Sequence, residues 1–111
     1  MILPVPPSSN KYWRVWRNRA VRSKEAEEYI AAARLEWKLQ QPSVKMLRGP
    51  IAVTLRWYRH EKRGDLDNRI KVALDSLKRL AFLDDAQIVR ILAERFEDKA
   101  RPRLEVEIDA A

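Results

Sequence analysis

The segment from Ile51 to Arg59 alternates strictly between apolar and mixed residues, and it constrains the fold more than any other stretch. Successive side chains of a β-strand point to opposite faces of the sheet, so one face of this strand is expected to be buried. The residues assigned to that face are Ile51, Val53, Leu55 and Trp57. Such a one-sided apolar sheet is stable only when other elements cover it.

Two stretches with helical spacing of apolar residues are predicted to provide this cover. Ser23 can cap a helix from Lys24 to about Gln40, and Pro42 marks its end. Its apolar stripe is Ala26, Tyr29, Ile30, Ala33 and Trp37. A second helix is predicted from Asp67 to about Leu80, with the stripe Ile70, Ala73, Leu74 and Leu77.

Further strands are predicted on both sides of these elements. Ile2–Val5 ends at Pro6-Pro7, and residues 12–23 are expected to form a hairpin around Asn18-Arg19. Ile88–Phe96 and Arg103–Asp109 are joined by a turn at 98–102, with Leu104, Val106 and Ile108 facing inward. The pattern predicts an α+β fold, a mixed β-sheet with two helices, in a single small domain of residues 1–111.

The chain has 23 Lys and Arg residues against 16 Asp and Glu, and its net charge of +7 favours a polyanionic partner such as nucleic acid. Residues 11–24 are rich in cations with Tyr12, Trp13 and Trp16 among them, so aromatic rings there can stack on bases. The alternative is a strand whose aromatic residues face the core. The expected DNA contacts are Lys11, Arg14, Arg17, Arg63 and Arg69.

Composition excludes several kinds of site. The chain has no Cys, two Gly and one His, which excludes thiolate metal sites, Gly-rich phosphate loops and Ser-His-Asp triads. The single His60 is expected on the surface and not as a general base. The chain has no run of 18 apolar residues and no secretion signal, so no membrane partner and a cytoplasmic location are expected.

Two acidic pairs stand out in this basic chain: Asp65 with Asp67, and Asp84 with Asp85. Carboxylates weaken the attraction to phosphates, but they can hold a divalent cation, because hard cations such as Mg²⁺ prefer oxygen ligands. Other roles are open at each position. Asp67 can cap the second helix, and Asp65 can interact favourably with the positive N-terminal end of the helix dipole. Asp84-Asp85 can form a turn.

Three segments resemble the RusA family of Holliday junction resolvases. They are Pro6-Pro7-Ser8-Ser9-Asn10-Lys11-Tyr12, Arg63-Gly64-Asp65-Leu66-Asp67-Asn68 with Lys71, and Leu83-Asp84-Asp85-Ala86-Gln87-Ile88-Val89. Their order and spacing match across nearly the whole chain. Genes of this family are common in prophages.

The resemblance implies an intimate homodimer that cuts four-way junction DNA with paired nicks during recombination and repair. Mg²⁺ is the implied cofactor, and Mn²⁺ is expected to substitute for it. By motif position, Asp65, Asp67 and Asp85 bind the metal, and Lys71 matches a functionally important lysine. Asp84 is the alternative to Asp85, because the join at 79–83 is one residue shorter than in many family members.

The spacing of these acids creates a geometric problem. A helix from Asp67 to Leu80 has 13 steps of 1.5 Å, which separates its ends by roughly 20 Å. Three carboxylates around one Mg²⁺ must lie within a few ångströms of each other. We therefore expect a metal site composed across a two-fold dimer, with Ile70, Leu74 and Leu77 near the interface. The alternative is an early helix end and a loop that folds back within one protomer.

Three other functions compete with this reading. The chain can be a nucleic-acid-binding module without enzymatic activity, whose acids only cap helices. It can be a metal nuclease for other branched DNA, such as flaps or forks. It can also be an inactive family member, although all the matched acids are present. A Mg²⁺-dependent nicking assay on synthetic junctions separates these readings.

Overall fold

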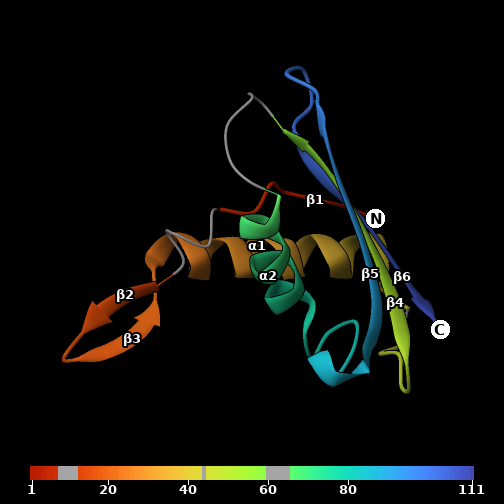
Figure 1. Ribbon diagram of the computed structural model, residues 1–111, viewed down its shortest axis with the longest axis horizontal. Coiled ribbons are helices and arrows are strands. Elements are labelled where there is room, and N and C mark those ends of the chain that lie inside the picture. Colours follow the sequence, from red (N-terminus) through yellow and green to blue (C-terminus); the bar gives the residue numbers. More distant parts are fainter. Residues whose placement is uncertain (8–12, 44, 60–65) are drawn as a thin grey trace.

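A computed structural model describes residues 1–7, 13–43, 45–59 and 66–111. Its centre is a mixed four-stranded sheet in the order β1-β6-β4-β5 (Figure 1). The strands are β1 (Ile2–Leu3), β4 (Ile51–Arg59), β5 (Ile88–Glu97) and β6 (Arg103–Ala110). β4 pairs in parallel with β5 and antiparallel with β6, and the helix α2 (Asp67–Leu77) lies in the crossover between the parallel strands. The predicted α+β fold with a mixed sheet is confirmed.

The alternation of β4 is confirmed residue by residue. Its burial switches at every position, and Ile51, Val53, Leu55 and Trp57 are each at most 2% exposed. Leu104 and Val106 of β6 join the same core, while Ile108 is half-buried. The helices α1 (Lys24–Gln40) and α2 contribute most of the rest of this core, together with Leu3, Ala81 and Phe82, so the apolar face of the sheet is covered as predicted.

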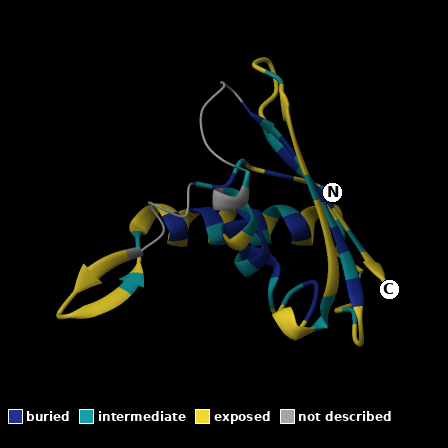
Figure 2. Ribbon diagram, viewed as in Figure 1, coloured by how far each residue is buried: buried dark blue, intermediate teal, exposed yellow. Residues whose placement is uncertain are grey.

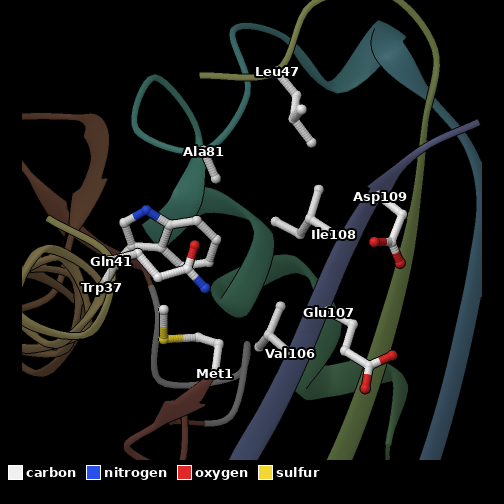
Figure 3. Close-up of a pocket in the computed structure, with 9 residues that line it drawn as sticks. All are labelled: Met1, Trp37, Gln41, Leu47, Ala81, Val106, Glu107, Ile108 and Asp109. Carbon is white, nitrogen blue, oxygen red and sulfur yellow. The ribbon is translucent and has the colours of Figure 1, made fainter. Parts of the chain in front are cut away.

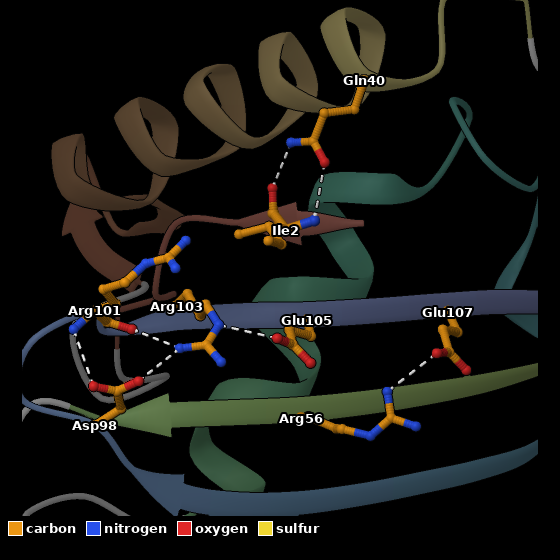
Figure 4. A network of polar contacts seen from close by, with 8 residues as sticks. All are labelled: Ile2, Gln40, Arg56, Asp98, Arg101, Arg103, Glu105 and Glu107. Carbon is orange, nitrogen blue, oxygen red and sulfur yellow. Dashed lines mark hydrogen bonds and ion pairs between the residues drawn. The ribbon is translucent and has the colours of Figure 1, made fainter.

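Helix α1 has the predicted bounds and cap. The Ser23 hydroxyl accepts a hydrogen bond from the Ala26 N–H at 3.2 Å. At the other end, the Gln40 side chain clamps Ile2, since Ile2 N–H donates to Oε1 at 3.0 Å and Nε2 donates to the Ile2 carbonyl at 2.6 Å (Figure 4). Strand β1 ends at Leu3 and not at Val5, because Pro4 has no N–H to extend the ladder.

Helix α2 ends three residues earlier than predicted. Leu77 is its last residue, Lys78 is extended, and Arg79 has a left-handed φ of 65°. The Arg79 N–H then donates to the Phe82 carbonyl at 2.6 Å, and the chain folds back so that Phe82 is fully buried. The apolar stripe could not reveal this reversal, since Leu80 continues the helical spacing. The capping role considered for Asp67 is wrong, because Leu66 holds the cap position and Asp67 is the first helical residue.

A separate hairpin, β2 (Trp13–Trp16) and β3 (Arg19–Arg22), extends away from the sheet and helices (Figure 1). Its turn residues are Arg17 and Asn18, with φ values of 51° and 59°, one position earlier than predicted. Two positive φ values are typical of the tight turn that matches strand twist. The hairpin is exposed almost throughout (Figure 2), and Trp16 is 51% exposed, so the core-facing alternative is wrong for Trp16. The side chain of Trp13 lies outside the described residues.

An ion-pair network fixes the connection from β5 to β6. Arg103 donates to Asp98 at 2.9 Å and to Glu105 at 3.0 Å (Figure 4). Its guanidinium also lies 3.8 Å from the centre of the Tyr58 ring. The hydrogen bond from Arg103 holds the pKa of Asp98 below its usual range. The predicted turn is confirmed, and this network stabilises it.

A hollow of about 260 Å³ lies between the end of α1 and β6 (Figure 3). Its lining is mostly apolar and includes Met1, Trp37 and Val106. None of the candidate site residues lines it, so we assign it to imperfect packing. In the part of the chain that the structure describes, no helix is both long and apolar enough to cross a membrane.

Candidate metal and nucleic-acid site

The predicted acids that the structure describes lie at the two ends of α2. Asp65 lies outside the described residues, and Asp67 begins the helix. Asp84 and Asp85 follow the chain reversal after the helix, at the short 3-10 turn η2 (Asp85–Gln87). The expectation that the two pairs lie at opposite ends of a helix is therefore confirmed for Asp67 and Asp85.

Asp84 and Asp85 have different surroundings, although they are neighbours. Asp84 caps η2, because its Oδ1 accepts a hydrogen bond from the Ala86 N–H at 3.3 Å. Asp85 is an exposed carboxylate, and its Oδ2 lies 3.7 Å from the Lys78 Nζ. The turn expected for this pair is present, and only Asp84 serves as its cap. The Asp85 carboxylate therefore faces the Lys78 ammonium group and does not cap the turn.

Gln87 holds η2 in place. Its Oε1 accepts from the Leu83 N–H at 2.7 Å and from the Asp84 N–H at 3.0 Å. Its Nε2 donates to the carbonyls of Leu47 and Gly49 at 3.0 and 2.9 Å. One side chain thus joins the turn that carries Asp85 to the segment before β4.

We expect Gln87→Ala to misplace Asp85 without unfolding the protein. Four hydrogen bonds are lost at partly exposed groups, which predicts a loss of about 1–3 kcal/mol in the free energy of unfolding. If Asp85 binds a metal ion as the resemblance implies, DNA cleavage should fall about tenfold or more, while the dissociation constant for DNA changes less than twofold, because Gln87 would act through Asp85. Chemical denaturation, single-turnover cleavage and a binding assay measure the three quantities. Equal losses of binding and cleavage would contradict this positioning role.

A groove of about 440 Å³ runs between α2 and the start of β5. Asp85 and Lys71 share this groove, and Lys71 Nζ lies 3.6 Å from Asp75 Oδ2. The other lining residues are apolar: Ile70, Leu74, Ile88 and Ile91. The structure therefore brings Lys71 and Asp85, two of the predicted site residues, to one surface. Leu77 and Leu74 are both buried in the protomer's own core, so Ile70, which is half-buried, is the residue of the predicted stripe that offers most surface to a partner; the interface itself stays a prediction.

Asp67 begins α2, and Asp85 follows the chain reversal after its last residue, Leu77. The rise from Asp67 to Leu77 is about 15 Å, and Asp85 shares its groove with residues of α2 from Ile70 to Asp75. Ligands of one Mg²⁺ lie about 2.0–2.1 Å from the ion, so their oxygens are much closer together than this rise. Among the described residues, no three acidic or imidazole side chains converge as a metal cluster. Both features of the alternative reading, the early helix end and the loop that folds back, are present, and they bring Asp85 closer to α2 than a helix to Leu80 would.

The predicted DNA contacts differ in their surroundings. Arg14 and Arg17 are exposed on the hairpin, and the Arg17 guanidinium lies 4.2 Å from the centre of the Trp16 ring. Arg69 turns inward, donates to the Pro6 carbonyl at 2.8 Å and lies 5.0 Å from the Trp57 ring centre. Burial lowers the pKa of Arg69. Its contact with phosphate stays a prediction, and Lys11, Arg63 and His60 lie outside the described residues.

Sequence reasoning missed Asp75, which lines the groove beside Lys71. The four-residue spacing between Lys71 and Asp75 was a usable signal, since such residues are neighbours on a helix surface. Lys78 was also missed. It follows the helix end, and only the chain reversal brings it to Asp85.

Comparison with known proteins supports the resemblance seen in the sequence. The family model described as "Endodeoxyribonuclease RusA" matches residues 4–109. The crossover junction endodeoxyribonuclease RusA of Escherichia coli K12 is 35% identical over 115 residues, which covers 96% of this chain and 89% of that protein. The corresponding protein of Enterobacteria phage 82 is 32% identical over 110 residues, with the same two coverages.

Proposed function

Because this chain belongs to the RusA family of endodeoxyribonucleases, we propose that it resolves four-way DNA junctions by metal-dependent hydrolysis of two symmetric phosphodiester bonds. The observation that carries the proposal is the groove that Asp85 shares with Lys71 and Asp75, with Lys78 paired to Asp85 at its border. An exposed carboxylate among cations suits a site that binds a metal ion and phosphate together.

The donor set fits a hard divalent cation such as Mg²⁺ or Mn²⁺. Asp85 offers carboxylate oxygens at the protein surface, and we assign Asp65 and Asp67 as the other ligands. When bound, the ion neutralises charge on the scissile phosphate group. Lys71 binds a non-bridging phosphate oxygen, since it is exposed and only loosely paired with Asp75 at 3.6 Å. Asp84 keeps its capping role and takes no part in the metal site.

The site is completed by a second copy of the chain. Asp67 begins α2 and Asp85 follows its end, and this placement at opposite ends of a helix with a rise of about 15 Å supports ligands from two protomers rather than one. The edge strand β5 supports the same view, because Val89, Ile91 and Leu92 are 62%, 43% and 51% exposed. A long apolar strand at a sheet edge invites pairing unless something covers it. A two-fold dimer through this strand and the groove covers it, and also supplies the two sites that paired cuts need.

The hairpin provides a contact with DNA away from the candidate metal site. Trp16 is half-exposed at its tip, beside the cations Arg14, Arg17 and Arg19. Cations bind phosphates and an exposed indole can stack on an unpaired base, which a junction centre offers. We therefore assign Arg14 and Arg17 to phosphates and Trp16 to a base or sugar face.

We expect Trp16→Ala to weaken junction binding about fivefold to tenfold, at the low end of the stacking range. Linear duplex has no unstacked bases, so its binding should change less than twofold. Thermal stability should stay unchanged, because Trp16 lies outside the core. Fluorescence anisotropy with both DNAs gives the comparison, and Leu35→Ala on α1 is a control for an exposed apolar residue. Equal weakening for both DNAs would contradict stacking at the junction.

A cleavage assay tests the proposed function. Purified protein is mixed with a mobile four-way junction, a flap or a linear duplex, each with Mg²⁺, Mn²⁺ or a chelator. We expect paired nicks in the junction with either metal and none with the chelator. Preferential cutting of the flap would assign another branched substrate, and binding without metal-dependent cutting would assign a non-enzymatic module.

A further inference from the structure

A basic hollow of about 490 Å³ lies between α1, the end of β3 and the segment that follows α2. Four cationic side chains from separate parts of the sequence meet there: Arg22, Arg34, Lys78 and Arg79. Ile30 and Asp75 complete the lining. These cations are distant in the sequence and meet only in the folded chain, so no sequence motif predicts this hollow.

One of these cations, Arg34, is held in place by backbone carbonyls. Arg34 is half-buried, and its Nη1 donates to the Lys78 carbonyl at 3.0 Å and the Ser76 carbonyl at 3.5 Å. Carbonyl oxygens orient a guanidinium but do not neutralise it. Arg34 therefore fixes the end of α2 and keeps its positive charge in a partly desolvated position, where charge interacts more strongly.

Arg79 adds a second, independent observation. It has a φ of 65° and follows the C-cap of α2, a position usually taken by glycine. An arginine in the left-handed region is uncommon and costs conformational energy. Its exposed side chain lines the hollow. A cation therefore occupies a position at which glycine would cost less conformational energy. Backbone outliers of this kind point to function.

The hollow adjoins the candidate metal site. Lys78 lines it and also lies 3.7 Å from Asp85. Asp75 lines both the hollow and the groove that holds Asp85 and Lys71. An anion bound in the hollow would therefore lie beside whatever occupies the groove.

We propose that this hollow binds a phosphate group of the DNA strand next to the scissile one. The inference rests on the proposed function, because it takes the scissile phosphate to lie near Asp85. Guanidinium groups match phosphate oxygens in pairs and keep their charge at any relevant pH. We name the hollow the flanking-phosphate pocket, defined by Arg22, Arg34, Lys78 and Arg79.

Arg79→Gly is a sharp test, since glycine suits the left-handed backbone while the cation is removed. We expect thermal stability to be kept or raised. Junction affinity, measured with Ca²⁺ in place of Mg²⁺, should fall about eightfold at 0.1 M salt, and the slope of log affinity against log salt should shrink by about 0.9. Lys38→Gln is the matched control. It removes one exposed cation from α1, the helix that carries Arg34, but lies outside the pocket, and should change affinity less than twofold.

Junctions with a single neutral methylphosphonate link locate the phosphate. A methylphosphonate at one position flanking the scissile phosphate should weaken binding by the wild type. The same substitution should leave binding by Arg79→Gly unchanged, because this variant has already lost the contact. The pocket would be overturned by an unchanged salt slope for Arg79→Gly. It would also be overturned if the loss of affinity from Arg79→Gly added to the loss from a methylphosphonate at every position. Neither result would affect the proposed function as long as the wild type cleaves the junction. Failure of the wild type to cut any branched DNA would overturn the proposed function and this pocket with it.

Discussion

Mixing two inactive variants, Asp67→Asn and Asp85→Asn, is expected to restore cleavage of the junction. Each variant alone should cut about a thousandfold more slowly, since a carboxylate that holds the metal ion is lost. If each site takes Asp67 from one protomer and Asp85 from its partner, a mixed dimer contains one site with both carboxylates. Random exchange leaves about a quarter of all sites complete, and their product is a single nick.

The reciprocal mixture gives the opposite result. Wild type mixed with the Asp67→Asn/Asp85→Asn double variant should form dimers in which neither site is complete. A site within one protomer reverses both outcomes, because the wild-type protomer then keeps its own site. Co-expression with two affinity tags isolates the mixed dimers, and a denaturing gel counts the nicks.

DNA binding separates a chemical defect from a folding defect in these variants. Asp67→Asn and Asp85→Asn each remove a negative charge, so junction affinity in the absence of metal should stay the same or rise. Asp85 is exposed and each substitution is nearly isosteric, so the melting temperature should move little. Loss of binding together with cleavage would contradict a metal-ligand role.

Ile91→Glu is expected to convert the protein to a monomer and to abolish cleavage. Ile91 is 43% exposed on the edge strand and lines the groove with Ile70 and Leu74, so glutamate is tolerated in a free protomer. In a dimer the carboxylate would be buried without a partner, which predicts a dimer at least about a hundredfold weaker. Sedimentation velocity measures the mass, and circular dichroism checks the fold.

A matched variant on another surface serves as the control for Ile91→Glu. Leu39→Glu changes an exposed leucine of α1, 66% exposed and away from the groove, and should leave mass and cleavage unchanged. A dimeric Ile91→Glu protein that still cleaves junctions would place the interface elsewhere. A monomer that cleaves at the wild-type rate would instead show that one protomer holds the whole site.

Local patterns predicted most of the elements because their physical causes are local. Alternation defined β4, and the spacing of Ala26, Tyr29, Ala33 and Trp37 with the Ser23 cap defined α1. The errors fell where a tertiary contact overrode such a pattern. The end of α2 is set by burial of Phe82, and the shorter β1 follows from Pro4 and the clamp by Gln40.

The sequence by itself determined the alternating strand, the two helices and the basic charge, and it placed the acidic pairs at opposite ends of one helix. Periodicity, capping and covalent spacing are sufficient for these conclusions. Only the tertiary structure separated the capping Asp84 from the exposed Asp85 and placed Lys78 beside Asp85. Only the tertiary structure gathered Arg22, Arg34, Lys78 and Arg79 into one pocket, because residues distant in sequence meet through chain reversals that no local pattern encodes.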